Sequence, residues 1–453
     1  MYLEAKMATL NDMVENWLTT RSMDPSMQRA IEVLSTKLST QGFDAADRYP
    51  ALETIRPCLE ERGYSLYHHF YDIDWHGLEN AMFSYPHFQD DEPSSAPQLP
   101  YSFFYGGGST YKDQQHAVQS PPMYYMTYAQ DSQHRHVALK LTKEGSVEYE
   151  AYRRLSQEKS LYVSDLVEFG CVMPPLDFVD LGDGWWFVVM PRWGDCALIP
   201  WFSSIQEVLH FIRSCLKGLS VLHKHLIIHR DIKSSNILVN HFAQGNGFRK
   251  DDFRPILRKT ERLSYALIDF DWSIVFPLDS KPSDRRLPAS ESFIWFCSFA
   301  NDTAQGEIDY DPFVFDVGSL VTPRTTQHLS NMVPMLAPFL DRMITRDLPT
   351  RFTATQALSF FDDYVVPSVG PTRLDTCPPS HDTDERQEPE VYDRWAGLDA
   401  DFVKTWAAYR LPPLEWSTKV LRWICYYPFG YTVVQSIRKI GRVLHRFIVG
   451  RPD

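Results

Sequence analysis

The sequence lacks the features that would place the chain across a membrane, outside the cell or on nucleic acid. It has no uninterrupted apolar stretch of about 18 or more residues, so we expect no conventional membrane span. Residues 1–6 do not open a basic region followed by an apolar run, and we expect no secretory signal. The net charge is −13, whereas nucleic-acid binding needs clustered cations, so we expect no nucleic-acid partner.

Cysteines are also few and are not arranged in pairs. The seven are Cys58, Cys171, Cys196, Cys215, Cys297, Cys377 and Cys425. An odd, scattered set without a C-x-x-C pair favours reduced thiols over a disulfide framework or a zinc site. Together with the missing signal, this predicts an intracellular protein, either cytoplasmic or nuclear.

The chain does contain ample apolar material, 44% of its 453 residues. That length exceeds the usual single core, so we expect one large two-lobed domain with extensions. Two acidic, proline-containing stretches predict linkers. The predicted segments are a helical and aromatic-rich extension, a linker, a central domain, a second linker and a C-terminal extension, at residues 1–89, 90–100, 101–365, 366–394 and 395–453.

The pattern inside the central domain changes near residue 194. Before it, short aromatic and β-branched runs predict strands, with one helix between them. These strands are expected over residues 101–105, 123–128, 136–141 and 185–190, and the helix over 146–155. From Ile205 onward an apolar stripe at helical spacing predicts a long helix, and residues 316–365 are again helical in pattern. The predicted fold class is therefore α+β.

The most informative stretch runs from His229 to Val239 and reads H-R-D-I-K-S-S-N-I-L-V. It resembles the catalytic loop of the eukaryotic-type protein kinase family. The resemblance implies that Asp231 accepts the proton of the substrate hydroxyl, Lys233 stabilises charge at the transferring phosphate, and Asn236 binds a metal ion. Because the lysine, the asparagine and the apolar run all follow at the right offsets, a chance H-R-D tripeptide is a poor explanation.

A strand motif upstream extends the resemblance. Residues 137–140 read V-A-L-K, like the V-A-I-K strand of the family. The resemblance implies that Lys140 holds the α- and β-phosphates of ATP and that Ala138 packs on the adenine. The helix that follows offers Glu148 as the partner of this lysine; Glu150 competes for the role but falls on another helix face.

A metal-binding element is expected downstream. Residues 266–271 read A-L-I-D-F-D and resemble the D-F-G element that follows a strand. Asp269 would bind Mg²⁺ together with Asn236, because a hard cation prefers oxygen ligands. Asp271 replaces the family's glycine, which permits backbone angles that aspartate tolerates less well.

Residues 187–193 resemble the strand and hinge that join the two lobes of a kinase. The resemblance implies that Met190 is the gatekeeper and that Leu238 closes the adenine pocket. Pro191 has no N–H, so a hinge donor must come from Arg192 or Trp193.

Two further matches lie in the second half of the domain. Residues 315–320 resemble a helix start at which a buried Asp316 anchors the catalytic loop, and residues 349–358 resemble the late R-x-T-A-x-x-x-L pattern. The A-P-E element is missing. Glu307 is the weak candidate to replace its glutamate as the partner of Arg351.

The match is poorest in the inserted loops. Gly106 and Gly108 stand where a phosphate-covering loop is expected, but their spacing is wrong and a flexible turn is nearly as good an explanation. A basic insert before Asp269 is expected to be a solvated loop. Its cations are Arg249, Lys250, Arg254, Arg258, Lys259 and Arg262. Potential phosphate acceptors follow at Ser280, Ser283, Ser290 and Ser292, and none is singled out.

The C-terminal extension ends in a predicted basic amphipathic helix. Its apolar face comprises Val433, Val434, Ile437, Ile440, Leu444, Phe447 and Ile448, and its cations are Arg438, Lys439, Arg442 and Arg446. We favour packing on the domain over peripheral contact with anionic lipid or an acidic partner.

The resemblance covers residues 101–365 and predicts a two-lobed α+β fold, with a β-rich first lobe at 101–193 and a mainly helical second lobe at 194–365. It implies an ATP- and Mg²⁺-dependent kinase, and Lys233 favours Ser/Thr hydroxyls of protein substrates. Two alternatives stay open. One is a pseudokinase scaffold, favoured by the poor glycine loop and the absent A-P-E. The other is a small-molecule kinase of the aminoglycoside or choline type, whose I-D-[FW]-[DE] metal site residues 268–271 also fit.

Overall fold

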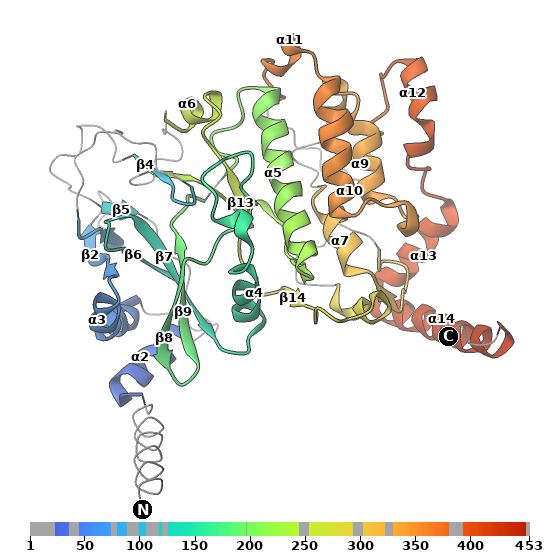
Figure 1. The fold of residues 1–453 in the computed structure, drawn as a ribbon. Helices are drawn as coiled ribbons and strands as arrows, with labels where there is room; N and C mark the ends of the chain where they lie inside the picture. The colour runs from blue at the N-terminus through green and yellow to red at the C-terminus, as the bar shows by residue number, and fades with distance from the viewer. Residues whose placement is uncertain are drawn as a thin grey trace, which may run out of the picture. The chain divides into compact units, whose positions relative to one another are not determined.

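The computed structural model describes most of the chain and divides it into two compact units (Figure 1). The described residues are 23–35, 45–73, 79–87, 99–105, 117–119, 126–195, 197–243, 253–292, 302–321, 329–379 and 393–449. The first unit comprises Met1–Asp165, Met173–Gly194 and Asn240–Lys250, and the second comprises Leu166–Val172, Asp195–Val239 and Asp251–Asp453. The predicted turn at Gly106 and Gly108 lies outside the described residues.

The first unit is built on a five-stranded antiparallel sheet with the order β1-β6-β7-β9-β8. Its strands are β1 (Ser65–Leu66), β6 (Met126–Gln130), β7 (His136–Lys143), β8 (Asp177–Gly182) and β9 (Trp185–Pro191). A second sheet joins β2 (His68–Ile73), β3 (Glu79–Ser84) and β5 (Ala117–Gln119), and β4 (Phe103–Tyr105) pairs in parallel with β12 (His241–Ala243). The strands predicted from β-branched and aromatic runs are present, with shifted ends.

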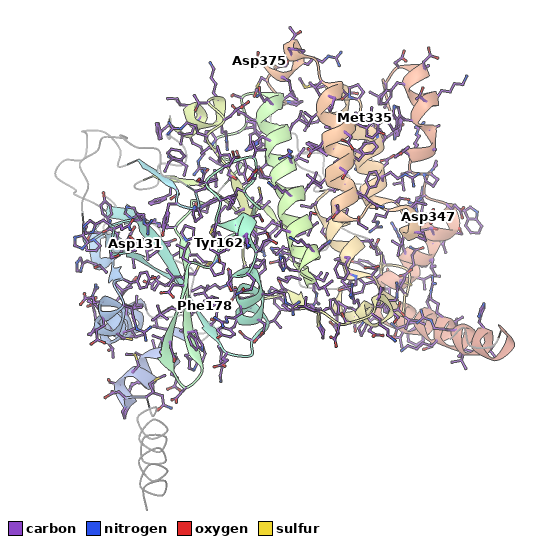
Figure 2. All side chains as sticks on the ribbon, viewed as in Figure 1. Asp131, Tyr162, Phe178, Met335, Asp347 and Asp375 are labelled. Atoms are coloured by element: carbon purple, nitrogen blue, oxygen red, sulfur yellow. The ribbon has the colours of Figure 1, made fainter. Side chains whose placement is uncertain are left out.

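Helix α4 (Val147–Leu155) follows β7 where a helix was predicted. Ser146 begins it as the N-cap, because its side chain accepts a hydrogen bond from the Tyr149 N–H. Tyr149 then packs on Phe178 of β8, which is labelled in Figure 2, with ring centroids 5.9 Å apart. The buried face of α4 thereby places Glu148 against the sheet, and Glu150 faces outward.

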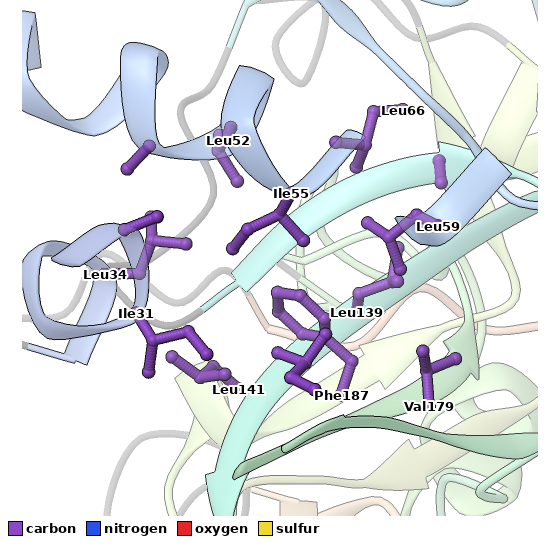
Figure 3. Close-up of a cluster of buried hydrophobic side chains, with 14 of the residues drawn as sticks. Ile31, Leu34, Leu52, Ile55, Leu59, Leu66, Leu139, Leu141, Val179 and Phe187 are labelled. Atoms are coloured by element: carbon purple, nitrogen blue, oxygen red, sulfur yellow. The ribbon is translucent and has the colours of Figure 1, made fainter. Parts of the chain in front are cut away.

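The N-terminal helices share a core with this sheet (Figure 3). Helices α2 (Pro25–Ser35) and α3 (Ala45–Glu61) contribute apolar side chains to a cluster with residues of β7, β8 and β9. Its members include Ile31, Leu34, Leu52, Ile55, Leu59, Leu139, Leu141, Val179 and Phe187. The described part of the N-terminal extension is therefore an integral layer of the first unit.

The second unit is organised around α5 (Ile205–Lys224), whose predicted apolar stripe is buried. Ser204 caps its start by accepting from the Glu207 N–H. Gly218 allows close packing, because a Cβ there would collide with the Cys171 carbonyl oxygen. Short strand pairs follow: β10 (Ile227–Ile228) with β14 (Ile274–Val275), β11 (Ile237–Val239) with β13 (Tyr265–Leu267), and β15 (Leu287–Pro288) with β16 (Asp309–Tyr310).

The remaining described helices complete the second unit (Figure 1). They are α6 (Phe253–Lys259), α7 (Pro312–Ser319), α9 (Leu336–Ile344), α10 (Ala354–Phe360), α11 (Pro371–Leu374), α12 (Ala400–Trp406), α13 (Trp416–Tyr426) and α14 (Pro428–Val449). The described segment from residue 394 to residue 411 is anchored on α9, because the buried Asp341 accepts hydrogen bonds from Arg394, the Trp395 indole and the Leu411 N–H. None of the described helices is both long and apolar enough to span a bilayer.

Candidate active site

The loop from His229 to Asn236 begins directly after β10, and α7 anchors it through hydrogen bonds to its backbone. Asp316 of α7 is fully buried, and its two carboxylate oxygens accept the backbone N–H groups of His229 at 2.7 Å and Arg230 at 2.8 Å. Arg230 has a φ of 65°, in the left-handed region that a non-glycine residue seldom adopts. The predicted anchoring role of Asp316 is confirmed, since its carboxylate stabilises this strained turn.

Three polar side chains of the loop converge above this anchor. The carboxylate of Asp231 is 3% exposed, and its Oδ2 accepts from Lys233 Nζ at 2.6 Å and from Asn236 Nδ2 at 2.9 Å. Asn236 Nδ2 also donates to the Asp231 carbonyl at 2.9 Å. A buried carboxylate is stabilised by such charge-assisted hydrogen bonds. The structure therefore brings together Asp231, Lys233 and Asn236, which were selected from the sequence.

The segment with Asp269 is fastened to the same loop. The Ile268 N–H donates to the Asn236 carbonyl at 3.0 Å, and the Ile268 carbonyl contacts His229 Nε2 at 3.1 Å. Phe270 is fully buried, with its ring 5.7 Å from that of His229. Asp269 has a φ of 75°, a strained conformation that aspartate adopts more readily than most residues.

Asp271 does not share the left-handed conformation of Asp269. The replacement of glycine by aspartate at this position therefore carries no left-handed backbone strain in this structure. The side chain of Asp271 is exposed.

Arg230 turns its side chain to the segment that follows β15. Its Nη2 donates to the Glu291 carbonyl at 2.5 Å, and its Nη1 lies 3.8 Å from Glu291 Oε2. Among the serines noted in this region, Ser283 and Ser290 are exposed. Ser292 is 2% exposed and bonded to Ala289 and Thr303, so it is a poor phosphate acceptor in this conformation.

The expected Glu307–Arg351 pair is wrong. Arg351 instead makes a bidentate ion pair with Asp302, at 2.7 Å for both contacts, and the two side chains are 1% and 3% exposed. Glu307 lies near Arg438 of α14, 3.8 Å away. The planar guanidinium fork matches the carboxylate of Asp302, and nothing in the sequence distinguishes Asp302 from Glu307 as its partner.

The expectation of a solvated basic insert is wrong for two of its arginines. Arg254 and Arg258 lie in α6 and are 1% and 5% exposed. Arg254 donates to the Ile199 carbonyl at 2.6 Å, and Arg258 donates to the Ala197 carbonyl at 2.6 Å and to the Pro200 carbonyl. Because main-chain carbonyls satisfy the guanidinium donors, these charges can be buried. Both side chains thus hold residues 197–200 in place.

The first unit contains the predicted lysine–glutamate pair. Lys140 Nζ of β7 lies 2.5 Å from Glu148 Oε1 of α4, and both side chains are nearly buried. Ala138 stands opposite Met190 in the β7–β9 ladder, and both residues are buried. The alternation of side chains along β7 puts Ala138 and Lys140 on one face of the sheet.

The two candidate hinge donors differ in their surroundings. The backbone N–H of Arg192 already donates to the His136 carbonyl at 3.0 Å. Trp193 is 5% exposed, and its indole donates to the Pro100 carbonyl at 2.7 Å. The Arg192 N–H is therefore engaged in the sheet.

The side chain of Arg192 is buried among aromatic rings of its own unit. Its guanidinium lies 3.9 Å from the Tyr128 ring centroid and 4.3 Å from that of Phe242. It also donates to the Tyr67 hydroxyl at 2.9 Å, and that hydroxyl contacts His136 Nδ1. Tyr67 belongs to the N-terminal extension, and its aromatic surroundings in the sequence were the only signal for this contact.

Comparisons with known proteins find similarity to protein kinases over part of the chain. The family model described as fungal protein kinase matches residues 193–294, which include the 229–239 loop and Asp269. The chain therefore resembles a divergent protein-kinase-like family. This kinase-like chain is also 27% identical over 165 residues to the serine/threonine-protein kinase PAK mbt of Drosophila melanogaster. That match covers 34% of the kinase-like chain and 24% of the relative, so the chain spans about a quarter of the relative's length.

Proposed function

We propose that the chain is an ATP- and Mg²⁺-dependent protein kinase that transfers the γ-phosphoryl group to Ser or Thr hydroxyls of protein substrates. The observation that carries the proposal is the buried Asp231 carboxylate, held by Lys233 and Asn236 on a loop that Asp316 anchors. Phosphoryl transfer needs little covalent chemistry from a protein and depends on positioning and electrostatics. A prearranged carboxylate, ammonium and carboxamide would supply both.

We assign each loop residue a role that its contacts support. The two hydrogen bonds to the Asp231 carboxylate both end on Oδ2, and we assign Oδ1 to the substrate hydroxyl. The proton of this hydroxyl passes to the carboxylate as its oxygen forms a bond to Pγ and the bond from Pγ to the ADP oxygen breaks. Lys233 is 36% exposed and therefore able to reach a phosphoryl oxygen while it contacts Asp231. The positive charge would stabilise the transferring group.

The metal and nucleotide ligands are assigned in the same way. Because Asn236 uses Nδ2 to donate to Asp231, its Oδ1 is the atom suited to Mg²⁺, together with the carboxylate of Asp269. When bound, Mg²⁺ would neutralise charge on the phosphates. In the first unit, Glu148 orients Lys140, which we assign to the α- and β-phosphates.

The adenine contacts expected from the sequence are retained as proposals. Ala138 and Met190 are buried partners on β7 and β9, and the Trp193 backbone is the proposed hinge donor. Leu238 of β11 is half-buried and is the proposed floor of the adenine pocket. Arg192 remains the other candidate donor, although its N–H donates to the His136 carbonyl and its side chain donates to the Tyr67 hydroxyl.

The test is transfer of the γ-phosphoryl group from Mg-ATP to the chain itself and to a generic Ser/Thr protein substrate. We expect Asp231→Asn to reduce transfer by about 10²- to 10⁴-fold, the usual contribution of a positioned general base. Asp363→Asn is the matched control, because Asp363 is an exposed aspartate of the same unit. Chelation of Mg²⁺ should abolish transfer.

Other outcomes would count against the proposal. Transfer that persists undiminished in Asp231→Asn would remove the assigned base. A folded protein that is stabilised by ATP but transfers nothing would favour a scaffold, and labelling of a small alcohol without labelling of protein would favour a small-molecule kinase.

A further inference from the structure

The C-terminal helices differ from the rest of the chain in charge. Residues 416–449 contain six lysines and arginines and no aspartate or glutamate, in a chain whose net charge is −13. The same stretch carries two tryptophans and several tyrosines and phenylalanines. It forms α13 and α14, which Figure 1 shows as the last helices of the second unit.

Helix α14 is attached to its unit by a polar face. Tyr431 and Gln435 donate to the Glu307 carbonyl at 3.4 and 3.2 Å. Arg442 pairs with Asp309 at 2.5 Å, and Arg438 lies 3.8 Å from Glu307. Residues 431, 435, 438 and 442 are spaced by four, three and four, so they follow one side of the helix.

The opposite side of α14 is apolar and exposed. Val433, Ile437, Ile440 and Leu444 share it at spacings of four, three and four. Their side chains are 39%, 63%, 61% and 54% exposed. The expected packing of α14 on the domain therefore occurs through its polar face, because the carboxylates of the 307–309 segment draw the arginines inward.

Exposed aromatic side chains extend this apolar surface. Trp416, Trp423 and Tyr426 of α13 and Phe429 at the start of α14 are 79%, 65%, 82% and 82% exposed. Large apolar side chains that are exposed in such number on one segment mark a contact site more often than an ordinary protein exterior. Tryptophan and tyrosine are enriched where one end of a side chain meets hydrocarbon and the other meets water.

We propose that α13 and α14 bind peripherally to an anionic lipid bilayer, with the apolar side of α14 lying in the boundary between headgroups and acyl chains. The positive charge of α13 and α14 favours an anionic bilayer as the binding partner. Lys419 and Lys439 are exposed, and a negatively charged lipid surface attracts such cations. A second copy of the chain would instead bring two like-charged helices together. A bilayer also accepts a continuous apolar stripe without a complementary pocket.

The test uses the full chain and vesicles of phosphatidylcholine with or without phosphatidylserine, separated by flotation. We expect binding to vesicles that contain phosphatidylserine and weaker binding at about 1 M than at about 0.1 M salt, since salt screens the headgroup charge. The double variant Ile437→Glu/Ile440→Glu should lose at least about tenfold in partitioning, because it puts carboxylates at the apolar boundary.

Two comparisons make the result specific. Ile256→Glu is the matched control: Ile256 is a 56% exposed isoleucine on α6 of the same unit, and its replacement should leave partitioning unchanged. Lys419→Glu/Lys439→Glu should reduce binding to the anionic vesicles by about fivefold or more per charge and abolish their preference over neutral ones. Unchanged circular dichroism and thermal midpoints would show that each variant is folded.

Three results would overturn the proposal. The first is a folded wild type that fails to float with anionic vesicles. The second is equal loss of binding in the Ile256→Glu control. The third is concentration-dependent self-association of the wild type that the Ile437→Glu/Ile440→Glu variant abolishes without any vesicle binding, which would assign the apolar side to a second copy.

Discussion

The buried Asp302–Arg351 pair gives a prediction that tests whether Asp302 or Glu307 is the partner of Arg351. Asp302→Asn removes one charge and leaves the Arg351 guanidinium 1% exposed without its carboxylate. Breaking a buried ion pair in this way costs about 3–5 kcal/mol, since an uncompensated charge stays buried. Arg351 keeps hydrogen bonds to the Thr345 and Val314 carbonyls, so we expect the lower end of that range.

Glu307→Gln is the matched change at the position predicted from the sequence. The carboxylate of Glu307 is 22% exposed and 3.8 Å from Arg438, and a contact of this kind contributes less than about 1 kcal/mol. The free energies of unfolding of the two variants should therefore differ by about 2 kcal/mol or more. Burial raises the pKa of Glu307 above its usual value.

Denaturant unfolding followed by fluorescence and circular dichroism measures both variants against the wild type. A third variant, Asp302→Leu/Arg351→Met, removes both charges and should recover much of the loss, because an apolar pair can replace a buried ion pair. The assignment would be refuted if Asp302→Asn cost less than about 1 kcal/mol, or if Glu307→Gln cost as much as Asp302→Asn.

Three further predictions concern other parts of the chain. Burial lowers the pKa of His136 from 6.5 to about 3, so folding favours the neutral imidazole. The stability that this neutral form contributes is fully present above about pH 6.5 and is lost by at most about 1.4 kcal/mol per pH unit as the pH drops toward 3. Unfolding midpoints compared at several pH values should therefore fall less steeply in His136→Gln than in the wild type. Arg254→Met should cost about 1–3 kcal/mol in a denaturant titration, because the Ile199 carbonyl loses the hydrogen bond of a buried donor. Lys259→Met, at an exposed site in the same helix, should be neutral within about 0.5 kcal/mol. Glu291→Arg should lower the proposed phosphoryl transfer about tenfold by repelling Arg230, with an unchanged unfolding midpoint, whereas Glu291→Gln should retain activity because the main-chain contact remains.

Local features of this chain could be predicted from the sequence because their physical cause is local. The resemblance of residues 137–140 and of the helix after Ser146 to the kinase strand and helix predicted the pairing of Lys140 with Glu148. The same holds for the apolar stripe of α5, which is buried as expected. The anchoring by Asp316 also followed from its motif, because the H-R-D turn needs an acceptor for its backbone N–H groups.

Features that depend on distant partners were predicted poorly. A run of cations in the sequence suggests solvation, but Arg254 and Arg258 are buried because carbonyls of residues 197–200 happen to face them. From the sequence, Asp302 and Glu307 are equally good candidates for the partner of Arg351. Only the folded path of the chain, which brings Asp302 to Arg351, distinguishes them. The orientation of α14 is a third case, since its amphipathic pattern does not reveal that Glu307 and Asp309 attract its basic side.

The N-terminal helices illustrate a signal that was present in the sequence but needed the topology to be understood. Val137, Leu139 and Leu141 alternate with Ala138 and Lys140 along β7, so the strand has an apolar face opposite the lysine. Covering such a face removes it from water, which stabilises the fold by roughly 25 cal/mol for each Å² of apolar surface buried. Helices α2 and α3 provide the cover, and all three apolar residues are at most 5% exposed. The segment before the kinase-like motifs thus covers the apolar face of the sheet that carries Lys140. Tyr67 of the same segment also accepts a hydrogen bond from Arg192.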